Sequence, residues 1–167
     1  MKIELKKISF NERMSEETNC FVADLHIDGK KVGYAKNNGQ GGCTDYNAYT
    51  PEDHKIIAEA EVYCKTLPKT KFHDMEFDQS LESVIDEYFE NWLNTKELKK
   101  FEKKMETGIL VGSPDENHSG YSYYNFKMPL SKINKGHLQS SIMSIKNKLK
   151  NGEVILNTNL QALGLNV

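Results

Sequence analysis

The chain has 167 residues, of which 38% are hydrophobic, and its formal net charge is −2. This length suits one domain and the apolar content is enough to bury a core, so we expect a single soluble domain. No run of eighteen apolar residues occurs, and residues 1–10 alternate charged and apolar side chains, which argues against a membrane span or a signal peptide and for a cytoplasmic protein. The three cysteines are odd in number and widely spaced, which is typical of free thiols.

The first third of the chain predicts an antiparallel β meander over residues about 2–49. Apolar residues take every second position in residues 2–10 and again in 21–27, which is the period of a strand with one buried face. Asp28-Gly29 then favours a tight hairpin turn into a third strand that ends near Lys36. Residues 44–49 alternate once more and predict a fourth strand.

Residues about 51–66 predict the first helix. Thr50 supplies a capping hydroxyl and Pro51 suits the first helical position. Pro68 requires that the helix has ended before it, because the residue ahead of a proline disfavours helical dihedral angles. We expect a polar connector over residues 69–77.

The longest periodic segment predicts a second helix, over residues about 80–105. Apolar side chains recur at helical spacing from Leu81 to Leu93. Whether this helix breaks near Asn94 stays open, because Thr95 could cap a separate segment. Four acidic side chains take the complementary positions of the same period and should face outward: Glu82, Asp86, Glu87 and Glu90.

After a loop rich in turn residues, the segment of residues about 121–127 predicts a strand and residues about 134–150 predict a last helix. Ser131 or Asn134 caps this helix, and Asn151-Gly152 ends it. Residues 154–156 could return as a short strand. Strands and helices thus come in blocks, which predicts an α+β fold with an N-terminal antiparallel β meander packed by three to four helices, in one domain of residues 1–167.

Charge is distributed unevenly along the chain. Residues 1–116 hold sixteen basic and twenty-three acidic side chains, whereas residues 117–152 hold six lysines and no acid. Such a segment can form a surface for a polyanion, although a lysine-rich helix face is often simply solvated. The candidate binding lysines are Lys127, Lys132, Lys135, Lys146, Lys148 and Lys150.

The strand over residues 121–127 is rich in aromatic side chains. Alternation places Tyr121 and Tyr123 on one face and Tyr124 and Phe126 on the other. If one face belongs to the core, the other leaves exposed tyrosines that can stack on bases or anchor a protein partner, and we expect Tyr121 and Tyr123 to do so. The alternative, that helices cover both faces, stays open.

A glycine-rich loop, Gly39, Gly41 and Gly42 followed by Cys43, is the other candidate site. It matches neither common phosphate-binding glycine pattern, so an irregular hairpin connection with positive φ angles is the main interpretation and ligand contact the alternative. Cys43 could act as a nucleophile if a histidine such as His118 lay beside it. No metal-binding spacing occurs, and we expect neither a metal nor a cofactor.

Lysine and asparagine are abundant and Arg13 is the only arginine, a composition that resembles proteins of AT-rich bacterial and phage genomes. The resemblance implies a small accessory protein of a phage or mobile element, a class that includes inhibitors of host nucleases such as anti-CRISPR proteins. We therefore expect a non-catalytic binding protein whose partner is a protein or a ribonucleoprotein. One alternative is a protein that binds single-stranded RNA through the basic C-terminal third, and another is a small cysteine- and histidine-dependent enzyme.

Overall fold

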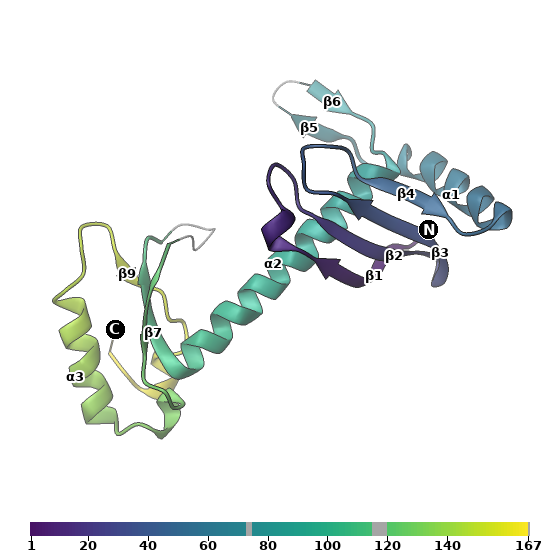
Figure 1. The fold of residues 1–167 in the computed structure, drawn as a ribbon. Helices are drawn as coiled ribbons and strands as arrows, with labels where there is room; N and C mark the ends of the chain where they lie inside the picture. The colour runs from purple at the N-terminus through teal and green to yellow at the C-terminus, as the bar shows by residue number, and fades with distance from the viewer. Residues whose placement is uncertain (73–74, 115–119, 167) are drawn as a thin grey trace. The chain divides into compact units, whose positions relative to one another are not determined.

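The computed structural model describes residues 1–72, 75–114 and 120–166, and its fold is α+β as expected (Figure 1). The chain divides into two compact units, residues 1–94 and residues 95–167. Helix α2 (Leu81–Thr107) runs through the boundary between them. Each unit contains buried hydrophobic clusters of its own. The expectation of a single domain stays a prediction.

The N-terminal unit is built on a four-stranded antiparallel meander, which confirms the predicted sheet. The strands β1 (Ile3–Phe10), β2 (Phe21–Ile27), β3 (Lys30–Asn37) and β4 (Asp45–Ala48) are neighbours in chain order. Asp28 and Gly29 join β2 to β3 with positive φ angles of 47° and 84°. These are the angles that a tight hairpin turn of the expected kind requires.

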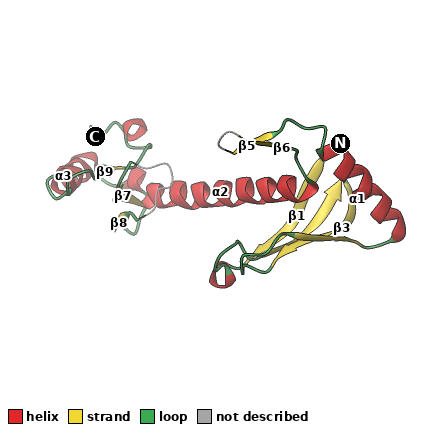
Figure 2. Cartoon of the chain, turned by 90° about the horizontal axis from the view of Figure 1, so that it is seen from above, coloured by secondary structure: helices red, strands yellow, loops and turns green. Residues whose placement is uncertain are grey.

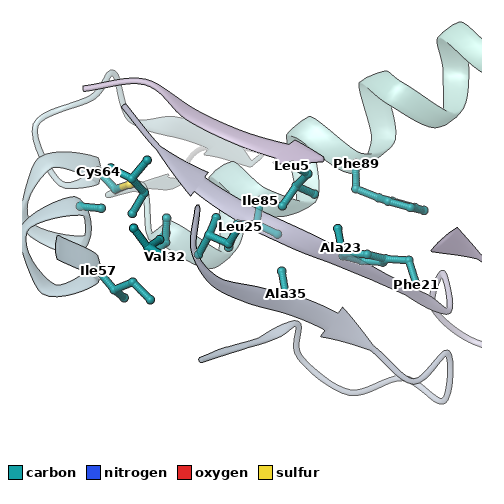
Figure 3. Packing of buried hydrophobic residues seen from close by; sticks show 13 residues of the cluster. Leu5, Phe21, Ala23, Leu25, Val32, Ala35, Ile57, Cys64, Ile85 and Phe89 are labelled. Atoms are coloured by element: carbon teal, nitrogen blue, oxygen red, sulfur yellow. The ribbon is translucent and has the colours of Figure 1, made fainter. Parts of the chain in front are cut away.

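Two helices cover one face of this sheet (Figure 2). Helix α1 (Pro51–Cys64) starts as predicted, with the Thr50 hydroxyl accepting a 3.1 Å hydrogen bond from the Asp53 amide. Figure 3 shows how α1 and the first turns of α2 pack on the inward side chains of the strands. Phe89 of α2 stacks on Phe21 with ring centroids 4.1 Å apart, and both rings are buried in this core.

The polar connector over residues 69–77 contains two short strands that the sequence analysis did not expect. Strands β5 (Thr70–Phe72) and β6 (Met75–Phe77) pair antiparallel. Lys71 lies directly opposite Glu76, and the two side chains form an ion pair at 3.3 Å. Three-residue strands are too short for an alternating pattern to stand out, so the sequence did not predict them.

Helix α2 is continuous from Leu81 to Thr107, which answers the question left open at Asn94. No proline or glycine occurs within it, and its second half is rich in Lys and Glu, which favour the helix. The described residues therefore contain three α-helices, and the fourth that a break would have created is not formed.

The C-terminal unit holds a three-stranded antiparallel sheet in the order β8 (Ser122–Asn125), β7 (Gly108–Gly112), β9 (Val154–Ile155). Helix α3 (Lys135–Lys146) packs on one face, where Leu138, Ile142 and Ile145 bury Ile109 of β7. Leu110 points to the opposite face and packs with the α2 side chains Phe101 and Met105. All residues of β7 are buried, because the sheet is covered on both sides.

The sequence predicted either Ser131 or Asn134 as the cap of the last helix, and the structure has one of the two. The Asn134 side chain accepts hydrogen bonds from the amides of Gly136 and His137, so Asn134 and not Ser131 is the cap. The helix ends at Lys146, four residues before the expected end, and Asn147 forms its C-cap. The turn that follows carries Lys148 and Lys150 outside the helix.

Candidate functional site

The glycine loop after β3 is held by one side chain, Asn37, which is only 8% exposed. Its carbonyl oxygen Oδ1 accepts hydrogen bonds from the Thr18 hydroxyl at 2.7 Å and the Gly39 amide at 2.9 Å. Its amide Nδ2 donates to the carbonyl of Gly42 at 2.9 Å. The loop is thereby closed on itself and on the segment that follows β1, which supports the interpretation of a hairpin connection.

Two of the glycines are required by this closure. Gly39 has a φ of +85°, and a Cβ atom there would lie 2.1 Å from the carbonyl oxygen of Met14. Gly41 has a φ of +81°, which strains any other residue, and a Cβ there would also displace the end of the Glu17 side chain. Positive φ and close approach of a neighbouring segment are the conditions that only glycine meets without strain.

The described surroundings of Cys43 disfavour the thiolate form that a nucleophile needs. Its thiol is exposed and lies beside the Glu82 carboxylate. A hydrogen bond to Glu82 and the charge of that carboxylate raise the pKa of the Cys43 thiol above its ordinary value. Reactive cysteines need a lowered pKa and a nearby cation. His118, the proposed base, lies outside the described residues.

Two of the four acidic side chains expected to face outward are turned towards the same loop. The Glu82 carboxylate accepts a 3.0 Å hydrogen bond from the Thr44 amide, and Asp86 accepts one of 2.6 Å from the Thr44 hydroxyl. Burial raises the pKa of the Asp86 carboxyl. Both side chains line a cavity of about 280 Å³. The outward expectation is correct for Glu87 and Glu90, which are exposed, and wrong for Glu82 and Asp86, because the loop covers this flank of the core stripe.

The two units carry opposite charge. Residues 1–94 contain 11 basic and 18 acidic side chains, a net charge of −7, and residues 95–167 contain 11 basic and 6 acidic side chains, a net charge of +5. In the C-terminal unit all six candidate lysines are exposed. None of these six forms an ion pair with an acidic side chain in the described ranges. The six side chains are Lys127, Lys132, Lys135, Lys146, Lys148 and Lys150.

Tyr121 and Tyr123 do not form an open aromatic face, because they pack against α2. The Tyr121 ring meets Phe101 edge to face at 5.4 Å, and the ammonium group of Lys104 donates a hydrogen bond to the Tyr121 hydroxyl. The Tyr123 hydroxyl is hydrogen-bonded to that of Thr107 at 2.6 Å. Both tyrosines are half-buried, and of the two alternatives the structure has the one in which helices flank both faces of the sheet.

The more exposed aromatic side chain of β8 is Tyr124, on the other face. It is 40% exposed and lies at the rim of a groove of about 410 Å³ between the end of β8 and helix α3. Helix α3 contributes Ser141, and Ser144 and Ile145 follow it at spacings of three and four, so the three residues lie on one side of the helix. We call this space the α3 groove, and its polar and aromatic lining consists of Tyr124, Asn125, Phe126, Ser141, Ser144 and Lys148.

The α3 groove thus brings together one predicted binding residue, Lys148, with residues that the sequence analysis did not single out. Tyr124 was assigned to the strand face opposite Tyr121, and its place beside a helix depends on the tertiary structure. Ser141 and Ser144 had a signal in the sequence, since they share one face of the helix predicted over residues 134–150 with Lys148, although Lys148 lies beyond the end of α3 in the structure. That signal becomes useful only when this side of the helix is known to face an aromatic strand.

Comparisons with protein-family models, with curated proteins and with solved structures find no match for this chain. Among the residues that the structure describes, no group of three His, Cys, Asp or Glu side chains could hold a metal ion. No helix in the same part of the chain is long and apolar enough to cross a membrane.

Proposed function

We propose that the protein is a non-catalytic binding protein, and that its C-terminal unit holds an anionic macromolecule. The observation that carries this proposal is the set of six exposed lysines without acidic partners among the described residues, on a unit of net charge +5. Unpaired lysines attract phosphate groups and release the counterions that surround them. Exposed ion pairs would neutralise such a surface, and the N-terminal unit has several of them.

The surroundings of Cys43 support a binding role over a catalytic one. This thiol is the only nucleophile that the sequence analysis considered, as part of an alternative interpretation, and its pKa is raised by a neighbouring carboxylate. A lysine surface, in contrast, needs no activated group to hold a polyanion. RNA, free or in a ribonucleoprotein, is a polyanion that fits this chemistry. A host ribonucleoprotein such as an RNA-guided nuclease also fits the Lys- and Asn-rich composition of an accessory protein.

The test compares two triple variants of the full-length protein with equal changes in charge. The first variant replaces Lys146, Lys148 and Lys150 with Gln. The second replaces three exposed lysines of the N-terminal unit with Gln, namely Lys6, Lys55 and Lys65. Each protein is used to capture partners from a bacterial lysate, and bound RNA and protein are identified by mass spectrometry and sequencing. Exposed charge changes alter stability by no more than about 0.5 kcal/mol each, so both variants should fold.

We expect the first variant to lose the captured RNA and the second to retain it. For a purified RNA ligand, the slope of log affinity against log salt should become shallower by about 2 in the first variant, at roughly 0.7 per lost contact. If both variants bind as the wild type does, or if affinity is independent of salt, the C-terminal lysines do not hold a polyanion and the proposed function is wrong.

A further inference from the structure

We propose that the α3 groove binds an unpaired nucleobase of a single-stranded nucleic acid, with Tyr124 as the stacking surface. This inference rests on the proposed function and names the ligand class of the same basic unit. Lysines alone hold phosphate and do not distinguish a single strand from a duplex. An aromatic ring beside a polar groove does distinguish them, because bases in a duplex are already stacked on one another.

Tyr124 is firmly placed yet accessible. It lies opposite Ile109 in the pairing of β8 with β7, and Ile109 is fully buried beneath α3. The strand pairing therefore fixes the backbone of Tyr124 while 40% of the residue stays exposed. A ring whose backbone is already ordered loses little conformational freedom when a base stacks on it. Tyr121 and Tyr123 are less suited to this role, since their rings pack with Phe101, Met105 and Leu110.

The helix side of the groove leaves room for the base. Ser141 and Ser144 place two small side chains across from the aromatic residues, and the volume of about 410 Å³ lies within the range of roughly 300–1,000 Å³ typical of small-ligand sites. The Ser141 hydroxyl donates to the carbonyl of His137 at 3.0 Å, so its oxygen can still accept a hydrogen bond. The Ser144 hydroxyl has no hydrogen-bond partner within the described residues, so it can both donate to and accept from a base edge.

The charge of the groove favours a nucleotide. Lys148 is exposed at the groove, and Lys146 and Lys150 are exposed close to it in the sequence. A base on Tyr124 would place its phosphates close to Lys148, so that stacking and charge act on the same ligand. An acidic peptide would use the lysines but would leave the aromatic ring and the serine hydroxyls without a matching group. The occupant that uses all three features is therefore a single-stranded nucleotide.

The experiment measures fluorescence anisotropy of labelled twelve-nucleotide probes with the full-length protein at low salt. The probes are oligouridine RNA, oligothymidine DNA, an abasic DNA of the same length and a duplex. Tyr124→Ala removes the stacking surface and Tyr124→Phe keeps it. Tyr49→Ala is the matched control, since Tyr49 is 51% exposed and lies in the N-terminal unit. Thermal unfolding of each variant shows that it is folded.

The wild type should bind oligouridine or oligothymidine more tightly than the abasic strand or the duplex, and the better of the two identifies RNA or DNA as the ligand. Tyr124→Ala should weaken binding of that strand by about 5- to 150-fold, the range that corresponds to loss of one stacked base. It should leave the abasic strand unaffected, and Tyr124→Phe and Tyr49→Ala should bind as the wild type does.

Two results would overturn the inference, and they are separable from failure of the proposed function. If the wild type binds abasic and base-bearing strands equally, or if Tyr124→Ala binds like Tyr49→Ala, no base occupies the groove. The lysine triple variant still decides the proposed function, since its readouts are captured RNA and the salt dependence of affinity, and not the difference between base-bearing and abasic strands. If Tyr124→Ala instead abolishes capture of a protein from nuclease-treated lysate while no probe binds, the groove is a protein-docking site and the inference is wrong.

Discussion

The Thr44 hydroxyl donates a 2.6 Å hydrogen bond to the carboxylate of Asp86, which lies 42 residues further along the chain. This bond ties the glycine loop after β3 to helix α2 within the N-terminal unit. It also explains why Asp86 is turned inward from the position that the helical period gives it. Burial raises the pKa of the Asp86 carboxyl, and the neighbouring charges of Glu82 and Glu90 raise it further, while the bond from Thr44 lowers it.

Because its folded-state pKa is raised, Asp86 binds protons more readily in the folded than in the unfolded protein. Its ionisation therefore lowers stability as the pH rises through this raised value. Asp86→Asn keeps an oxygen that accepts from Thr44 and removes the charge. We expect this variant to have a higher melting temperature than the wild type at pH 7. The gain should shrink as the pH falls towards about 3.9, the ordinary carboxyl pKa. Glu87→Gln, at an exposed site on α2, is the control, and an equal gain there would contradict the argument.

Thr50 is expected to stabilise the start of α1. Its hydroxyl accepts from the Asp53 amide and donates to the Asp53 carboxylate at 2.8 Å. Thr50→Ala should lower the free energy of unfolding by about 1 kcal/mol, the usual value of an N-cap. Thr50→Ser retains the hydroxyl and should restore most of the loss. Urea denaturation measures both variants, and equal stability of the two would show that the hydroxyl does not act as a cap.

Asn157 is expected to be essential to the C-terminal unit. It is buried, accepts a 2.7 Å hydrogen bond from the Leu110 amide and donates one of 2.9 Å to the Gly108 carbonyl. Asn157→Ala would leave both backbone groups of β7 buried without these partners, at about 1–3 kcal/mol each. We expect a loss of at least about 2 kcal/mol in the free energy of unfolding. The control, Asn47→Ala at an exposed site on β4, should change stability little. A comparable loss there would show that the loss at Asn157 does not come from its buried hydrogen bonds.

Cys43 is expected to be accessible but slow to react. In a Cys20→Ser background, alkylation by a neutral reagent should become rapid only above the ordinary pKa of a thiol, because Glu82 disfavours the thiolate. Glu82→Gln should accelerate labelling at pH 8, since it removes the charge that raises the pKa. Cys64 is buried and should stay unlabelled in the folded protein. Rapid labelling of Cys43 at pH 6 would instead indicate an activated thiol.

Local signals in the sequence predicted much of the fold. Asp28-Gly29 and Thr50-Pro51 act through nearest neighbours, so the turn and the helix start follow from a few residues. The continuous course of α2 past Asn94 was undecided, because a capping residue such as Thr95 is compatible with a helix interior. The paired strands β5 and β6 were missed, because they are too short to show a period.

The site was harder to predict, because it depends on which side of a strand each helix occupies. Alternation correctly separated Tyr123 from Tyr124, yet nothing local indicates that α2 packs on the first and α3 lies beside the second. The same limit affected Glu82 and Asp86. Their helical positions flank the buried stripe, and only the loop carrying Thr44 makes that flank an interior one.

The opposite charges of the two units have a practical consequence for chromatography. The isoelectric point of about 6.2 describes the whole chain, and it predicts that a sulfonate resin will not retain the protein at pH 7. Adsorption, however, depends on the charge of the surface that contacts the resin. The C-terminal unit, with a net charge of +5, can contact a sulfonate resin. The protein should therefore bind cation- and anion-exchange resins at the same pH, through the C-terminal unit on the first and the N-terminal unit on the second.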